Sequence, residues 1–184
     1  MGDRVSSGGV KIIFSDTNTH CRGESNYRTS GVSDAMRIPK DSYFAHQVMW
    51  DGWVTPETSR TYIIGHWNYE PGTVKPVYVV SDAPRVELLL NGEKIGREKV
   101  DYHFLHTFDS IPYAPGTLTA VSYDEAGKKL SEHSVSTAGA PAALRLSVET
   151  SPAGMMADGA DMALVQFEVV DAEGRRCPLD NREV

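Results

Sequence analysis

The sequence predicts a mainly β protein, and three observations support this prediction. Asn91-Gly92 separates two extended runs, which is the strongest short-range signal for a β-hairpin because a type I′ turn requires positive φ at both central residues. Residues 117–123 alternate in character as a strand with one buried face does. Turn signals recur between residues 55 and 138 and separate seven or so short strands. That spacing is typical of an immunoglobulin-like β-sandwich.

The part before the sandwich differs from the rest. Residues 10–14 form a short apolar run that predicts a buried strand, and residues 15–31 form a long polar loop. Pro39 and the acid close behind it predict the start of a helix, which we expect to end at Asp51-Gly52. Strand, loop and helix make one β/α unit, and one unit cannot bury its own apolar faces.

The chain is therefore expected to consist of three parts. Residues 1–54 form a β/α unit of a larger domain, residues 55–138 form a sandwich, and residues 139–184 form part of a second sandwich. A small-residue linker begins the last part. The strands expected from these patterns cover residues 61–67, 75–81, the two arms of the 85–96 hairpin, 103–108, 117–123, 130–137, 144–149 and 163–171.

Composition narrows the class of partner. The net charge of −7 argues against a nucleic acid or an anionic membrane, because both attract a basic surface. No apolar run approaches the length of a membrane span, and the first ten residues lack the apolar core of a signal peptide. We expect no nucleic-acid or membrane partner, and any export signal is expected to lie outside this chain.

The cysteines and the common site motifs predict no metal and no cofactor. Cys21 and Cys177 lie far apart without metal-type spacing, and neither C-x-x-C, H-E-x-x-H nor a Gly-rich phosphate loop occurs. Two free thiols are the preferred interpretation, and a disulfide between them is the alternative.

Six charged residues of the hairpin and the segment after it are interpreted as a solvated face. They are Glu87, Glu93, Lys94, Arg97, Glu98 and Lys99.

Five segments, in order, resemble the region that follows the catalytic barrel in glycoside hydrolase family 2, the β-galactosidase group. Residues 25–50 resemble the last β/α unit of the barrel, and residues 66–72, H-W-N-Y-E-P-G, resemble a family segment in which Tyr69 replaces a Trp. Residues 86–96, 112–124 and 136–141 resemble the first sandwich after the barrel. The positions that match the barrel-unit signature are Gly31, Asp34, Pro39, Lys40, Asp41, Tyr43, Phe44, Gln47 and Trp50.

The resemblance implies that this chain is the C-terminal portion of a retaining β-glycosidase acting on terminal β-linked sugars. Such enzymes use two barrel carboxylates roughly 5 Å apart, and the family's glutamates lie upstream of position 1. We therefore expect no catalytic residue here, no activity of the chain alone, and contact with carbohydrate only through the rest of the barrel. A homo-oligomeric parent enzyme and a periplasmic or secreted location are compatible with the resemblance.

Candidate substrate-binding residues follow the first predicted strand, where α/β folds place their sites. Asp16, Asn18 and His20 alternate beyond it, and such side chains bind sugar hydroxyls well. Glu24 lies in the same polar loop and would face sugar hydroxyls in an intact barrel. For all four, a solvated polar loop is the alternative.

Trp50 is the remaining candidate, because an aromatic face stacks on the C–H surface of a sugar ring. The preferred interpretation is that Trp50 and Trp53 pack the helix against the sandwich. Two other classes of protein stay open: a carbohydrate-binding module, and an adhesin-type structural protein that neither binds nor catalyses.

Overall fold

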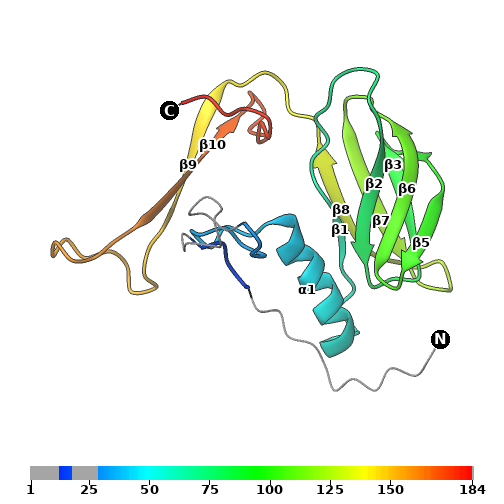
Figure 1. Cartoon of the computed structure of the whole chain (residues 1–184), viewed down its shortest axis with the longest axis horizontal. Helices are drawn as coiled ribbons and strands as arrows, with labels where there is room; N and C mark the ends of the chain where they lie inside the picture. Colours follow the sequence, from blue (N-terminus) through cyan, green and yellow to red (C-terminus); the bar gives the residue numbers. More distant parts are fainter. Residues whose placement is uncertain (1–12, 18–28, 184) are drawn as a thin grey trace, which may run out of the picture.

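The computed structural model describes residues 13–17 and 29–183, and these residues are mainly β, as the sequence predicts (Figure 1). The elements are α1 (Asp41–Val54), β1 (Thr61–Ile63), β2 (Val74–Ser81), β3 (Arg85–Leu90), β4 (Glu93–Ile95), β5 (Glu98–Tyr102), β6 (Leu105–Pro112), β7 (Thr117–Tyr123), β8 (Lys129–Ser136), β9 (Ala143–Glu149) and β10 (Leu164–Val170). In the described part of the chain, no helix is long and apolar enough to cross a membrane.

Strands β1 to β8 form a sandwich of two antiparallel sheets, in the orders β1-β2-β6-β5 and β4-β3-β7-β8. If the strands are lettered A, B, C, C′, D, E, F and G along the chain, the sheets read A-B-E-D and C′-C-F-G. This is the strand order of an immunoglobulin-like sandwich with one C′ strand added. The fold class predicted from turn spacing is confirmed.

The core lies between the two sheets and is built from alternate residues of their central strands. Leu118, Ala120 and Ser122 are at most 1% exposed, so the face expected from the alternation of residues 117–123 is the inner one. Trp67 is also 1% exposed and donates its indole N–H to the carbonyl of Ala114 at 3.0 Å. The buried cluster consists of Ile63, Trp67, Val77, Val79, Val86, Leu88, Phe108, Ile111, Leu118 and Ala120.

The hairpin β3–β4 has the predicted turn. Asn91 and Gly92 have φ values of 53° and 86°, and Leu90 pairs with Glu93 across the turn. Positive φ at both central residues is the requirement of a type I′ turn, which matches the right-handed twist of the flanking strands.

Side chains close the open side of the sandwich between β1 and β8. The Thr61 and Ser131 hydroxyls lie 2.7 Å apart, and the backbone N–H of Ile63 donates to Nδ1 of His133 at 3.1 Å. The His133 side chain of β8 thus satisfies one backbone N–H on the β1 edge, which leaves that group unavailable to another strand.

The prediction of a solvated hairpin face is wrong for Glu98. This residue begins β5, a strand that was not predicted, and it pairs with the core residue Phe108. Its carboxylate accepts hydrogen bonds from the backbone N–H of Val86 at 2.7 Å and from Nδ1 of His106 at 2.5 Å. Val86 belongs to the opposite sheet, so Glu98 joins the two sheets at one end of the core.

Several element boundaries also differ from expectation; for example, the strand expected at residues 103–108 is β6, Leu105–Pro112. The strand predicted at residues 61–67 ends at Ile63, because Gly65 takes a φ of +89° that breaks the extended ladder. Helix α1 continues to Val54 instead of ending at Asp51-Gly52. A Cβ at Gly52 would lie 2.9 Å from Cβ of Asp82, so this glycine permits close packing on the sandwich and does not stop the helix.

The first predicted strand, residues 10–14, lies mostly outside the described residues. Residues 13–17 contain no strand, and Ser15 makes one isolated parallel bridge to Ser33.

Strands β9 and β10 form a separate antiparallel ribbon, which lies to the left of the sandwich in Figure 1. Its cross-strand pairs place apolar side chains together on one face: Val148 with Val165, Leu146 with Phe167, and Leu144 with Val169. Most of these side chains are about half exposed or more. A two-stranded ribbon is marginal alone, and its place in a second sandwich stays a prediction.

Candidate functional site

Asp16, the first candidate, is buried in an ion pair. It is 4% exposed, and Nζ of Lys40 lies 2.7 Å from its carboxylate. The backbone N–H of Gly31 also donates to it at 2.9 Å, while Lys40 donates to the carbonyl of Thr29 at 3.1 Å. A Cβ at Gly31 would lie 2.3 Å from the carbonyl carbon of Ser15, so only glycine fits. The pair joins the chain before residue 18 to the chain after residue 28.

Asn18, His20 and Glu24 lie outside the described residues, as does Cys21. Their role in lining a substrate pocket stays a prediction, and so does that of Asp16. Cys177 is a buried free thiol whose Sγ lies 3.8 Å from the carbonyl of Gly139.

Helix α1 is anchored to the sandwich at its N-terminal end by an aromatic and polar contact. The Tyr62 hydroxyl donates to the carboxylate of Asp41 at 2.8 Å, and the rings of Phe44 and Tyr62 stack at 4.7 Å. Burial, together with this bond to a carboxylate, raises the pKa of Tyr62 well above its ordinary value. The neutral hydroxyl that makes the bond therefore persists across the physiological pH range.

The C-terminal half of α1 is held by a second group of contacts. Arg60 forms an ion pair with Asp51, and the carboxylate of Asp82 accepts hydrogen bonds from the Ser59 hydroxyl at 2.7 Å and the Arg60 N–H at 3.0 Å. Gly52 packs on this same Asp82. The helix is thus in contact with the sandwich side near both of its ends.

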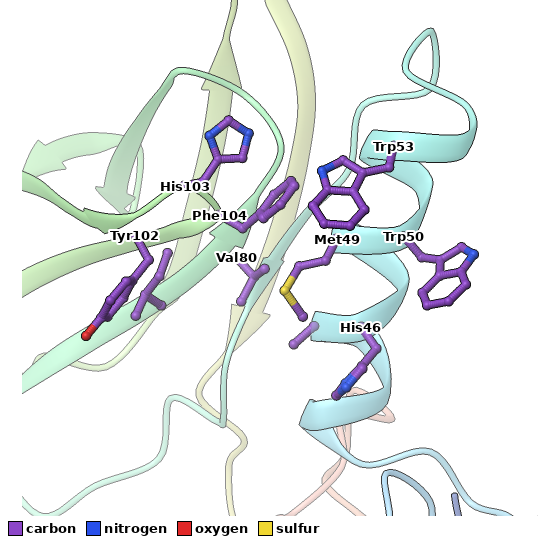
Figure 2. A pocket seen from close by; sticks show the side chains of 10 residues that line it. His46, Met49, Trp50, Trp53, Val80, Tyr102, His103 and Phe104 are labelled. Carbon is purple, nitrogen blue, oxygen red and sulfur yellow. The ribbon is translucent and has the colours of Figure 1, made fainter. Parts of the chain in front are cut away.

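An apolar groove of about 660 Å³ lies between α1 and the outer face of the β2–β6–β5 sheet (Figure 2). The Trp53 ring lies 6.2 Å from that of Phe104, although Trp53 is 76% exposed. Trp50 is 67% exposed and points away from the sheet (Figure 2). Packing of the helix on the sandwich therefore involves Trp53 only in part, and it does not use Trp50, contrary to expectation.

The groove offers surface for packing but few groups for chemistry. Its walls are mostly apolar, with His46 and His103 as the only titratable side chains besides Tyr102. Within the described ranges, no three His, Cys, Asp or Glu side chains are placed to hold a metal ion. A catalytic role for this groove has no support in its side chains, and sugar stacking on Trp50 stays a prediction.

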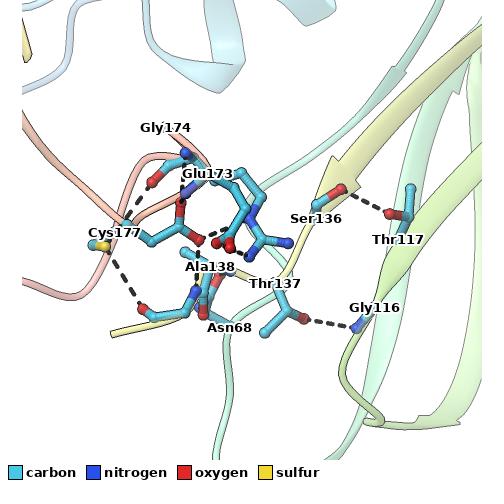
Figure 3. A network of polar contacts seen from close by, with 12 residues as sticks. Asn68, Gly116, Thr117, Ser136, Thr137, Ala138, Glu173, Gly174 and Cys177 are labelled. Atoms are coloured by element: carbon cyan, nitrogen blue, oxygen red, sulfur yellow. Dashed lines mark hydrogen bonds and ion pairs between the residues drawn. The ribbon is translucent and has the colours of Figure 1, made fainter. Parts of the chain in front are cut away.

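The linker after the sandwich is held by side chains on both sides (Figure 3). Asn68 exchanges two hydrogen bonds of 3.2 Å with the backbone of Ala138, and the Thr137 hydroxyl donates to the carbonyl of Trp67 at 2.7 Å. On the other side, the N–H of Gly139 donates to Asp171 at 2.7 Å. The small-residue linker predicted from the sequence is therefore a fixed joint.

Asp171 organises this joint from a buried position. Burial by itself would raise the pKa of its carboxyl, but backbone N–H groups of Gly139 and Arg175 and the Arg175 guanidinium outweigh burial and lower it to about 2. The carboxylate is therefore ionised at any physiological pH, and Arg175 pairs with it at 2.7 Å.

Sequence reasoning missed the residues that anchor α1. Asp41 carried a signal as an acid in the first helical turn and as a position of the resembled barrel unit, and Tyr62 only as a strand residue, but neither signal indicated their contact. Their contact joins positions 21 residues apart, and no local spacing indicates it.

Comparison with known proteins identifies the class to which this sandwich and its helix belong. Residues 72–131 match a family described as a domain of unknown function, DUF4982. A solved β-glucuronidase of glycoside hydrolase family 2 superposes with a TM-score of 0.80 at 37% identity, covering 91% of this chain and 17% of that one. The chain therefore belongs to glycoside hydrolase family 2, as its resemblance implies.

The sequences of two relatives align with most of this chain. A β-glucuronidase of Formosa agariphila is 40% identical over 183 residues, covering 97% of this chain and 18% of that protein. The β-galactosidase BoGH2A of Bacteroides ovatus is 33% identical over 149 residues, covering 80% of this chain and 17% of that protein. This chain thus spans less than a fifth of the length of the relatives it matches.

Proposed function

We propose that this chain is the C-terminal part of a retaining β-glycosidase of the β-galactosidase type, which hydrolyses terminal β-linked sugars. In this proposal residues 1–54 end the catalytic (β/α)8 barrel, residues 55–138 are the first sandwich after it, and residues 139–184 begin a second. The acid/base and nucleophile carboxylates, roughly 5 Å apart in retaining enzymes, are supplied by barrel strands outside this chain. The chain contributes a sandwich that holds the end of the barrel in place, a role we call bracing.

The observation that carries this proposal is the anchoring of α1. One side of the helix is fixed to the sandwich through Asp41, Phe44 and Asp51. Another side presents Trp50, which is 67% exposed, and the helix shows apolar residues on most of its surface. Helices that are apolar all round are normally buried, so the exposed side suits the rest of a barrel. A sandwich that grips this helix would hold the end of the barrel in place.

The type of sugar is the finer part of the proposal. One relative is named a β-glucuronidase and another a β-galactosidase, and both match this segment. We therefore assign the choice between galactoside and glucuronide to residues outside this chain, and the parent enzyme is to be tested with both sugars.

The test uses two proteins and two chromogenic substrates. The purified 184-residue chain is expected to release no nitrophenol from nitrophenyl β-galactoside or β-glucuronide, whereas a rate that Glu24→Gln abolishes would overturn the proposal. The polypeptide encoded by the whole reading frame is expected to hydrolyse one of them, and NMR of the fresh product should show the β-anomer first.

The bracing role has its own test in that longer polypeptide. Asp51→Ala, which removes the partner of Arg60, should lower the temperature at which activity is lost. Glu87→Ala removes an exposed ion pair with Lys94 and serves as the matched control. Equal effects of the two substitutions would refute the bracing role.

The exposed aromatic residues favour a second candidate, a carbohydrate-binding module. Trp53 and Tyr102 are 76% and 75% exposed and both line the groove beside α1. Titration of oligosaccharides into the 184-residue chain, followed by Trp fluorescence, separates the two candidates. Saturable binding at micromolar concentration that Trp53→Ala abolishes would support the module, and an unchanged spectrum would support the brace.

A further inference from the structure

The Asn91 side chain makes more contacts than its turn requires. Besides the backbone hydrogen bond from its N–H to the carbonyl of Thr117 at 2.9 Å, its Oδ1 accepts the N–H of Thr117 at 2.9 Å. Its Nδ2 donates to the carbonyl of Pro115 at 3.2 Å. The carboxamide is therefore held on both sides by the β6–β7 turn, which lies beside the β3–β4 hairpin.

Gly116 makes room for this carboxamide. A Cβ at Gly116 would lie 1.9 Å from Oδ1 and 2.5 Å from Cγ of Asn91, and the φ of Gly116 is +141°. No other residue fits here without displacing the Asn91 side chain. Asn91 and Gly116 thus form a matched pair, which we call the Asn91 clasp.

The residue after Asn91 makes the Asn91 side chain susceptible to a chemical reaction. Gly92 has no side chain to hinder its backbone nitrogen, so an Asn-Gly pair is prone to cyclise. In that reaction the Gly92 nitrogen loses its proton to solvent and attacks Cγ of Asn91. The bond from Cγ to Nδ2 breaks, Nδ2 takes up a proton from solvent and leaves as ammonia, and a succinimide forms. Water then opens either succinimide carbonyl to give aspartate or isoaspartate.

We propose that Asn91-Gly92 is a latent deamidation site that the folded sandwich keeps closed through the Asn91 clasp and that unfolding opens. Attack on Cγ makes this planar carbon tetrahedral and expels Nδ2, so the two hydrogen bonds that hold the carboxamide oppose it. The product would not restore the clasp, because an aspartate carboxylate cannot donate to the carbonyl of Pro115. An isoaspartate would also lengthen the main chain within a turn that sets the pairing of β3 with β4. The modification is therefore expected to lower the stability of the folded sandwich.

The experiment compares deamidation of the 184-residue chain when folded in buffer and when unfolded in urea, at one pH and temperature, by peptide-mapping mass spectrometry. Because two hydrogen bonds oppose the attack, Asn91 in the folded chain should react slower by a factor on the order of ten or more. Asn68, followed by Tyr69, is the internal control and should react slowly in both states. Equal rates for Asn91 in the two states would overturn the proposal.

Two variants assign the protection to the clasp. Gly116→Ala should raise the rate at Asn91 in buffer toward the unfolded value, while the tryptophan fluorescence of the chain stays that of the folded state. A folded Gly116→Ala chain that reacts as slowly as the unsubstituted chain would also overturn the proposal. Asn91→Asp reproduces one product directly and should unfold at a lower temperature, and an unchanged transition would refute the proposed consequence. If Gly116→Ala does not fold, the comparison of folded and unfolded native chain decides.

Discussion

Replacing Glu98 by alanine tests the most unexpected contact of the sandwich. The substitution removes the acceptor of two donors, the backbone N–H of Val86 and Nδ1–H of His106. Val86 is 1% exposed and His106 is fully buried, so water cannot replace the carboxylate at either donor without opening the core. A carboxylate oxygen only accepts, which means that the imidazole nitrogen facing it is the donor.

The magnitude follows from the cost of leaving buried donors without acceptors. Each such donor costs about 1–3 kcal/mol, and the Glu98 side chain is itself 20% exposed, which admits some water at its outer end. We therefore expect Glu98→Ala to lower the free energy of unfolding by about 3 kcal/mol. Glu98→Gln keeps one acceptor oxygen and should lose less.

Urea unfolding of the 184-residue chain, followed by tryptophan fluorescence, measures this difference. Glu87→Ala is the matched control, because it removes a carboxylate of the same hairpin region that pairs with an exposed Lys94. Surface pairs of this kind contribute about 0–1 kcal/mol. If Glu98→Ala costs no more than Glu87→Ala, Glu98 belongs to the solvated face after all and the reasoning from buried donors fails.

Three further predictions concern packing, pH and the linker. Gly52→Leu should lower the melting temperature of the chain, because even a Cβ at this position would lie 2.9 Å from Cβ of Asp82. Overpacking of this kind lowers the free energy of unfolding by about 1–3 kcal/mol. An unchanged melting temperature would disprove the close contact. Burial lowers the pKa of His133, so the unfolded chain binds a proton more readily, and stability should fall as pH drops through about 6.5 and recover above it. His133→Asn should flatten that dependence in urea titrations at several pH values, and a slope equal to that of the native chain would contradict the assignment. Asp171→Ala should speed hydrogen exchange at the Gly139 amide without changing exchange in the sandwich core; equal protection in both proteins would show that the joint does not depend on this carboxylate.

Local patterns were sufficient for the elements whose signals lie within a few residues. The turn at Asn91-Gly92 depends on two adjacent backbone conformations, and the inner face of β7 depends on alternation along a single strand. The start of α1 also lies where a proline followed by an acid predicts it. Each of these features is governed by the chemistry of neighbouring residues, so sequence alone predicts them.

The candidate site shows the opposite case. Asp16 was selected as a polar side chain beyond a strand, yet its carboxylate is engaged by Lys40, 24 residues later in the chain. Nothing in the spacing of residues 15–31 indicates that partner. Whether Asp16 also borders a substrate pocket depends on barrel strands that this chain does not contain in the proposed arrangement.

The two cases differ in how far apart in the sequence the interacting residues lie. Periodicity and turn chemistry determine which residues extend, turn or coil, whereas the order of strands in each sheet depends on distant pairs such as β2 with β6 and β3 with β7. Burial is decided by what the other sheet or helix places opposite a side chain. Glu98 and Gly52 have unremarkable local sequences, and only the tertiary structure sets one against the buried N–H of Val86 and the other against Asp82. A charge can be accommodated in a core, and a glycine inside a helix, because the compensating groups come from distant parts of the chain.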